Sequence, residues 1–188
     1  MYGLVNRAIE DLVVTAHGAD AWSKVLGQVD ISVDRFESME PYDDSITYAL
    51  VGAASAVVET PAHDLLEAFG RHWILYTGAE GWGQILDAQG SSVVEVIGNL
   101  NAMHARVRAT MPSMVVPEFR VVESDGDVVC FEYHSHRDGL APMVLGLMRG
   151  LAERFGESWE VAQISDRAQD GFDTFELRLQ PEAALSAP

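Results

Sequence analysis

The chain has 188 residues, enough for one substantial hydrophobic core but not for two independent full-sized domains. Its 29 Asp and Glu residues against 12 Lys and Arg residues give a formal charge of −17, which disfavours nucleic acid and anionic membrane surfaces as partners. A hydrophobic content of 48% excludes a disordered chain. The single cysteine, Cys130, excludes an internal disulfide and a zinc site of several thiolates, and we interpret it as a buried structural thiol.

The amino-terminal segment MYGLVNRAIEDLVVTAHG lacks the features of a secretion signal. No segment reaches the roughly 18 uninterrupted apolar residues that a membrane helix needs. We therefore expect a cytoplasmic protein without a membrane partner.

The first part of the chain has helical periodicity. We expect helices over residues 2–17 and 20–26, an acidic loop over 34–45, and further helices over 45–60, 61–78, 82–88 and 91–112. The helix over 61–78 begins at Pro61, a residue that suits the first turn of a helix.

After Pro112 and Pro117 the pattern changes to strands. Strands are expected over 119–124 and 127–137, separated by an Asp-Gly hairpin signal, then a helix over 140–156, and a second hairpin with strands over 158–167 and 171–179 joined by the AQDG turn. This order predicts an α+β fold with a four-stranded antiparallel sheet: a helical amino-terminal lobe over 1–60, a second α+β lobe over 61–182 and a frayed tail over 183–188, all within one cooperative unit.

His104 stands out because it lies in an apolar helical stripe. Six residues recur at three- and four-residue steps and share one helix face: Val93, Ile97, Leu100, His104, Val107 and Met111. A buried imidazole needs a partner. One interpretation is a core histidine bonded to a backbone carbonyl, and the other is a ligand of a metal or heme iron.

Tyr133, Ser135 and Arg137 alternate within a predicted strand, so their side chains should project from one face while His134 and His136 point away. A phenol, a hydroxyl and a guanidinium in a row suit a ligand with two carboxylates, because arginine binds a carboxylate in bidentate fashion. The alternative is an ordinary solvated strand face. Combined with the imidazole on the apolar helix, the row fits heme, whose iron takes an axial base and whose propionates need anchors.

These residues also carry a resemblance to a known family. The chain resembles the heme-nitric oxide/oxygen binding domain, the bacterial relative of the heme domain of soluble guanylate cyclase, in the segments MYGLVNRAIEDLV, NLNAMHARV, MPSMVVPEF, YHSHR and GLAPMVLGLMRGL. Its most specific parts are the Tyr-x-Ser-x-Arg motif and a histidine about thirty residues upstream. The resemblance implies heme b (iron protoporphyrin IX) as cofactor, His104 as its proximal iron ligand, and Tyr133, Ser135 and Arg137 as propionate anchors. It assigns the heme-distorting proline to Pro117, with Pro112 as a second candidate.

The resemblance also predicts a distal pocket. In O₂-binding members a tyrosine on the helix after the motif donates a hydrogen bond to bound oxygen, and Met143 stands at that position here. Met143 and Leu147 would line the pocket with Trp73 and Ile74, and this mostly apolar pocket should favour NO and CO over O₂. The indole N–H of Trp73 could itself donate inward. Ordinary core packing explains the same four residues without a ligand.

We therefore expect a heme-based gas sensor and not an enzyme. NO would break the bond between iron and His104, relax the strain held by Pro117 and let the amino-terminal lobe shift. No kinase or cyclase segment is recognisable, so signalling would go through a separate partner, which in this family is typically a histidine kinase or a cyclic-di-nucleotide enzyme. The alternatives are a heme or dicarboxylate carrier without signalling and a hydrolytic enzyme, although the G-x-S-x-G and H-E-x-x-H motifs are missing.

Overall fold

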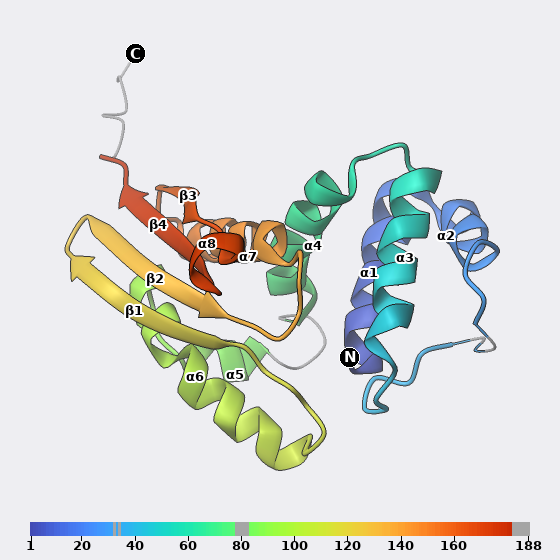
Figure 1. Cartoon of the computed structure of the whole chain (residues 1–188), viewed down its shortest axis with the longest axis horizontal. Helices are drawn as coiled ribbons and strands as arrows, with labels where there is room; N and C mark the ends of the chain where they lie inside the picture. Colours follow the sequence, from blue (N-terminus) through green and yellow to red (C-terminus); the bar gives the residue numbers. More distant parts are fainter. Residues whose placement is uncertain (32, 34, 78–82, 182–188) are drawn as a thin grey trace.

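A group of amino-terminal helices lies beside an antiparallel sheet that carries helices on one face (Figure 1). The computed structural model describes residues 1–31, 33, 35–77 and 83–181. The elements in chain order are α1 (Gly3–His17), α2 (Ala19–Leu26), α3 (Asp44–Val57), α4 (Ala62–Thr77), α5 (Gly83–Asp87), α6 (Val93–Thr110), β1 (Glu118–Asp125), β2 (Val128–His134), α7 (Ala141–Phe155), β3 (Trp159–Ser165), α8 (Arg167–Asp170) and β4 (Asp173–Leu179). Among the described residues, no helix is both long and apolar enough to cross a bilayer.

The sheet has the strand order β1-β2-β4-β3, and all neighbouring strands are antiparallel. In this register Tyr133 of β2 lies between Phe119 of β1 and Asp173 of β4. Phe131 and Phe175 point to the same inner face, where their rings stack at 5.3 Å in the core that α6 and α7 cover. The α+β class with a four-stranded antiparallel sheet is thus confirmed.

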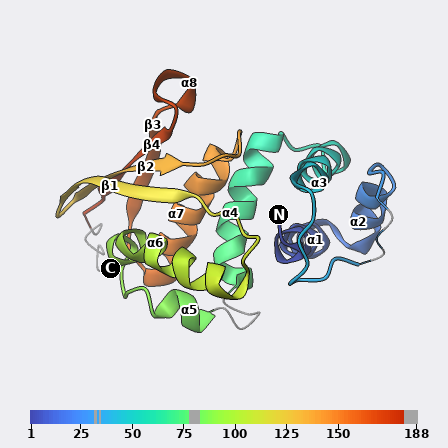
Figure 2. The same cartoon turned by 60° about the horizontal axis from the view of Figure 1, so that its bottom comes forward.

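Two hydrophobic clusters share α4. Leu65, Phe69 and Tyr76 pack with α1, α2 and α3, whereas Ile74 packs with α6, α7 and the sheet. Figure 2 shows α4 between the amino-terminal helices and the rest of the molecule. Helix α4 therefore joins the two parts of the structure through opposite faces.

Helices α4 and α7 touch along their backbones. A Cβ added at Gly146 would lie 1.9 Å from the carbonyl oxygen of Glu67, and one added at Gly70 would lie 2.0 Å from that of Met143. An ion pair between Arg71 and Glu153, at 2.6 Å, flanks this contact. The glycines thus allow a close approach that a side chain would prevent.

Strand β2 is shorter than the sequence predicts. It ends at His134, so Ser135 and Arg137 lie beyond the strand, and the prediction that they share a strand face with Tyr133 is wrong. The reason is in the register, because β1 begins opposite His134 and β4 begins opposite Tyr133, which leaves no partner strand further on.

The structure also differs from the sequence prediction at the AQDG segment, where a turn is expected. Residues 167–170 form the short helix α8, which Asp166 caps by accepting a hydrogen bond from the backbone N–H of Ala168 at 2.8 Å, and β3 ends before it. Trp82, in the predicted helix over 82–88, and the tail over 183–188 lie outside the described residues. Cys130 is buried as expected, and burial raises the pKa of its thiol.

Candidate functional site

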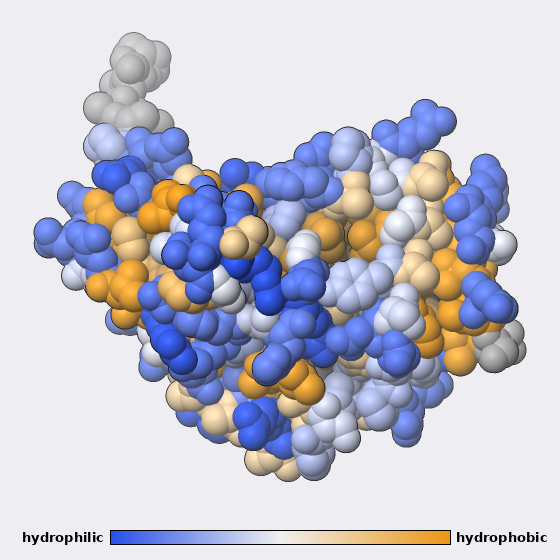
Figure 3. All heavy atoms as spheres, in the orientation of Figure 1, coloured by the Kyte–Doolittle hydropathy of each residue, from blue (hydrophilic) through white to orange (hydrophobic). Residues whose placement is uncertain are grey.

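A cavity of about 670 Å³ lies between the amino-terminal helices and the sheet side of the molecule, within the size range of ligand pockets. Its wall is mostly apolar and includes residues of α1, α3, α4, α5, α6 and α7, of the segment between α6 and β1, and of β2 and the segment between β2 and α7. Figure 3 shows apolar residues in a recess near the middle of one face, with further apolar patches towards both sides of that face. Six of the seven methionines line the cavity: Met1, Met103, Met111, Met114, Met143 and Met148. These flexible, polarizable side chains can adapt to a large flat ligand.

His104 lines this cavity from α6. Its Nδ1 is buried and makes no hydrogen bond of regular geometry. Burial lowers the pKa of the imidazole. An irregular hydrogen bond with the backbone of Pro117 raises this pKa, but by less than burial lowers it. The ring is therefore neutral at neutral pH and has the protonation state that a metal ligand requires.

The segment that follows α6 is fixed against the helix. Asn101 donates a hydrogen bond to the carbonyl of Phe119 at 2.6 Å and accepts one from its N–H at 2.9 Å. These two hydrogen bonds fix the start of β1 beside the turn of α6 that carries His104. The ring centres of His104 and Phe119 lie 6.0 Å apart there. Pro117 lines the cavity, whereas Pro112 is exposed and does not. Of the two candidate prolines, only Pro117 is in a position to contact a ligand beside His104.

Tyr133 also reaches the cavity and is 5% exposed. Burial raises the pKa of its phenol, against the smaller opposing effects of a hydrogen bond with Ser135 and the charge of Arg137. Ser135 itself is not part of the wall, and its Oγ accepts a hydrogen bond from the backbone N–H of Arg137 at 3.1 Å. The phenol is thus a protonated donor at the wall, while Ser135 shapes the turn behind it.

Arg137 lines the cavity with a side chain that is 17% exposed. Its Nε and Nη2 donate to the Asp44 carboxylate of α3 at 2.7 and 3.3 Å, and its Nη1 donates to the carbonyl of Val115 at 2.8 Å. Asp44 also pairs with the amino group of Met1. Burial is the largest influence on the pKa of Asp44 and would raise it, but the bonds from Arg137 and the amino group hold it below its ordinary value.

Sequence reasoning missed Asp44. An arginine in a cavity wall indicates that some carboxylate lies near it. The chain has 29 acidic residues, however, and nothing in the local pattern distinguishes this one. Only the packing of α3 against the segment after β2 brings the two groups together.

Trp73, Ile74, Met143 and Leu147, the four predicted distal residues, all line the cavity. The Trp73 ring packs against Phe69, with ring centres 6.0 Å apart. Two hydroxyl groups of the same wall are bonded within the protein. Thr47 donates to Asn6 Oδ1 at 2.7 Å, and Tyr48 donates to the carbonyl of Asp138 at 3.0 Å.

The donor set fits heme. A neutral imidazole with a buried nitrogen, a guanidinium, a phenol and a long apolar wall meet in one cavity, which matches an iron ligand, anchors for carboxylates and a surface for a porphyrin ring. A bare metal ion fits less well, because no group of three or more His, Cys, Asp or Glu residues comes together in the part of the chain that the structure describes.

The chain is similar to known proteins over most of its length. A family model described as Haem-NO-binding matches residues 2–163. The chain is 27% identical to soluble guanylate cyclase gcy-35 of Caenorhabditis elegans over 93% of its residues, and 23% identical to soluble guanylate cyclase 89Db of Drosophila melanogaster over 82%. It spans about a quarter of the length of these curated relatives, 26% and 23% respectively.

Solved structures share the fold. The unliganded Fe(II) H-NOX protein from K. algicida has a TM-score of 0.84 and 23% identity, with 97% of this chain and 98% of that chain covered. The H-NOX protein from S. oneidensis in the Fe(II)NO state has a TM-score of 0.86 and 18% identity, with 96% of this chain and 100% of that chain covered.

Proposed function

This chain belongs to the Haem-NO-binding (H-NOX) family, and we propose that it senses NO through a heme b that His104 holds. It is a heme-binding gas-sensor domain related to soluble guanylate cyclase, and a sensor rather than a catalytic domain. The observation that carries the proposal is the neutral imidazole of His104, whose buried Nδ1 has no regular hydrogen bond, in the wall of a 670 Å³ cavity.

Four residues would hold the cofactor. His104 would ligate the iron, Arg137 and Tyr133 would bind the heme carboxylates, and Pro117 would press on the porphyrin from beside the imidazole. Ser135 would help to orient Arg137, because its hydroxyl accepts a hydrogen bond from the backbone N–H of that residue. When bound, heme supplies a ferrous iron that takes up diatomic gases.

An apolar distal wall supports a preference for NO and CO over O₂. Bound O₂ carries partial negative charge and gains from a hydrogen-bond donor, whereas NO and CO depend on one much less. Met143 lines the pocket with a thioether at the position that the family resemblance assigns to the phenol of O₂-binding members, and Ile74 and Leu147 are apolar. The hydroxyls of Thr47 and Tyr48 already donate to protein acceptors.

Three polar contacts could carry a signal between the two parts of the molecule. Asp44 binds Arg137, Tyr48 donates to the Asp138 carbonyl, and His72 lies 2.8 Å from Asp11 of α1. Release of His104 from the iron would free α6 and the Pro117 segment, and the amino-terminal lobe would then shift across these contacts.

The partner would be a separate histidine kinase or cyclic-di-nucleotide enzyme. The formal charge of −17 would favour a basic patch on that partner, since complementary charge speeds association and selects among partners.

The test is heme reconstitution of the purified protein, followed by absorption spectra under argon, air, CO and NO. We expect a Soret band that NO and CO shift and air does not. His104→Gly should lose the ligated spectrum and regain it with added imidazole. His136→Gly is the matched control, because that histidine is exposed and is not part of the wall.

Colourless protein that resists heme loading would end the proposal. Heme uptake with an unchanged spectrum in His104→Gly would instead point to a carrier whose iron is held elsewhere. A stable complex in air would overturn the argument from Met143.

A further inference from the structure

A second layer of polar residues supports the segment that carries Arg137. Arg167, the first residue of α8, donates from Nη1 to the carbonyl oxygen of Arg137 at 2.8 Å. The same nitrogen lies 2.7 Å from the Asp138 carboxylate, and the Arg167 side chain is 32% exposed. One guanidinium therefore holds both the last residue of the motif and the residue after it.

Arg167 is itself fixed by a buried carboxylate. Asp173 is 6% exposed, and its Oδ1 accepts from the backbone N–H of Arg167 at 3.2 Å and from Gln163 Nε2 at 2.9 Å. Asp173 lies directly opposite Tyr133 in the pairing of β2 with β4. Helix α8, which stands at the end of the β3–β4 hairpin in Figure 2, is thus tied to the point of the sheet that carries the phenol.

The segment after β2 needs such support. Since β2 ends at His134, residues 135–138 have left the sheet, and side chains must set their orientation. On one side Asp44 and Tyr48 of α3 bind this segment, and on the other side Arg167 does. The Arg167 contact comes from the sheet side of the molecule and holds the backbone of this segment, and from the same side the Val115 carbonyl accepts a hydrogen bond from the Arg137 side chain.

We propose that Arg167 is a positioning residue that keeps the Arg137 guanidinium at the cavity wall while the α3 contacts change, and that Asp173 fixes Arg167 for this task. The inference rests on the proposed function, since the anion that Arg137 would hold is a heme carboxylate. The contact with Asp138 alone would contribute little, because that carboxylate is 85% exposed and water screens the pair. The bond to the Arg137 carbonyl is charge-assisted and fixes a backbone direction.

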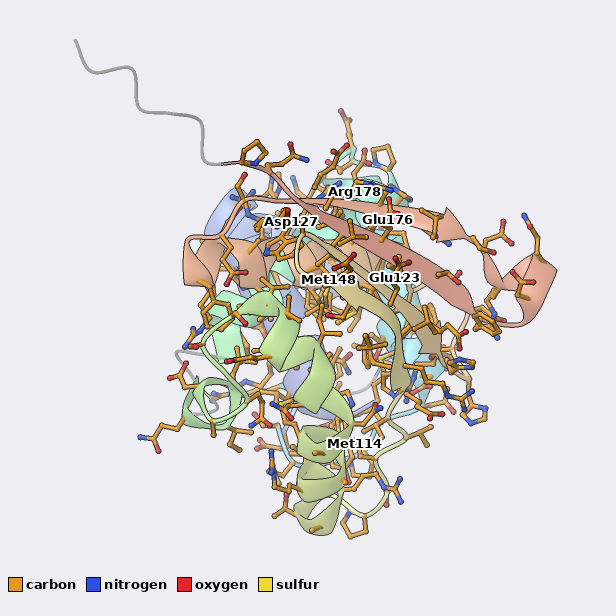
Figure 4. All side chains as sticks on the ribbon, turned by 90° about the vertical axis from the view of Figure 1, so that its left-hand side faces the viewer. Met114, Glu123, Asp127, Met148, Glu176 and Arg178 are labelled. Carbon is orange, nitrogen blue, oxygen red and sulfur yellow. The ribbon has the colours of Figure 1, made fainter. Side chains whose placement is uncertain are left out.

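The test compares Arg167→Ala, Arg167→Lys and Asp138→Asn. The matched control is Arg178→Ala, an exposed arginine of β4 that pairs with Glu176 at the other end of the same sheet (Figure 4). Three quantities are measured: amide hydrogen exchange of residues 135–138 in the heme-free protein, the rate of heme transfer to apomyoglobin, and the propionate bending band in the resonance Raman spectrum.

For Arg167→Ala we expect faster exchange in residues 135–138, a shifted propionate band and heme release about tenfold faster, the factor that one lost charge-assisted hydrogen bond implies. Arg167→Lys should restore part of each effect, because an ammonium keeps the charge but lacks the planar fork. Asp138→Asn should change little, because it leaves the bond to the carbonyl. Arg178→Ala should match the wild type.

The proposal is overturned if Arg167→Ala keeps the amide exchange, the heme release rate and the propionate band of the wild type. It is also overturned if Arg178→Ala changes these quantities as much as Arg167→Ala does. If Arg167→Ala fails to fold, Arg167→Lys decides in its place, since a wild-type propionate band and release rate there would count against it. If the wild-type protein takes up no heme, the proposed function fails. The exchange measurement still decides whether Arg167 orders residues 135–138.

Discussion

Because α4 and α7 touch along their backbones, a single methyl group added at Gly146 should lower the stability of the protein. In Gly146→Ala the new Cβ would lie 1.9 Å from the Glu67 carbonyl oxygen and 2.9 Å from the Arg71 nitrogen. Both neighbours are backbone atoms of a helix, so neither can turn away. The helices would have to separate by about 1 Å, which loosens the packing of the apolar side chains around them.

The expected magnitude follows from two opposing effects. Overpacking of a tight site costs about 1–3 kcal/mol or more, while alanine in place of glycine within a helix stabilises by about 1 kcal/mol. Gly98→Ala, in α6, is the matched control, because nothing lies within 4 Å of a Cβ there. For a chain of this size 1 kcal/mol moves the melting temperature by about 2–4 °C. Gly98→Ala should therefore raise the Tm by a few degrees, and Gly146→Ala should lower it.

Thermal unfolding of the heme-free proteins, followed by circular dichroism, measures both shifts. In the loaded proteins the same Gly146→Ala change should broaden the absorption spectrum of the CO complex, because Met143 and Leu147 on α7 move relative to Trp73 and Ile74 on α4. A Tm for Gly146→Ala at or above that of the wild type would refute the reasoning, since it would mean that the helices have room for the methyl group.

Three further predictions concern the cavity. Met143→Tyr supplies a phenol at the distal wall and should give a complex that persists in air, which absorption spectra would detect; a spectrum that stays unliganded would contradict the apolar-pocket argument. Asp44→Asn removes the counterion of Arg137 and should speed amide exchange in α3 at neutral pH. Because the pKa of Asp44 is lowered, its stabilising effect is present above about pH 4 and is lost on acidification, so the difference from the wild type should disappear at lower pH. The pKa of His104 is lowered by burial, so below about pH 6.5 the unfolded chain binds a proton that the folded heme-free protein resists. Urea unfolding should show stability falling from about pH 7 to pH 5 more steeply than in His104→Gln, and equal slopes would count against a buried neutral imidazole.

Periodicity predicted the features that depend on one element alone. The apolar stripe of α6 requires only the spacing of Leu100, His104, Val107 and Met111, and all four line the cavity. Alternation and turn signals likewise predicted the strands of the sheet, because a half-buried strand must place every second side chain inward.

Features that depend on two elements could not be predicted in this way. The end of β2 at His134 is set by where β1 and β4 begin, so the positions of Ser135 and Arg137 beyond the strand follow from the register and not from their own alternation. The pairing of Asp44 with Arg137 joins residues 93 positions apart in the chain. Local patterns carry no information about such a contact.

Because α4 contributes side chains to both hydrophobic clusters, the boundary near residue 60 is not a point of exchange between relatives. A chimera that joined the first 60 residues of this chain to the remainder of another member would keep the foreign α4, and Leu65, Phe69 and Tyr76 would be replaced under helices that evolved against them. A crossover after Tyr76 would instead set the native α4 against a foreign α7 across the close contact of Gly70 with Gly146, so functional hybrids should need compensating changes on one face of α4 whichever side of it the crossover lies.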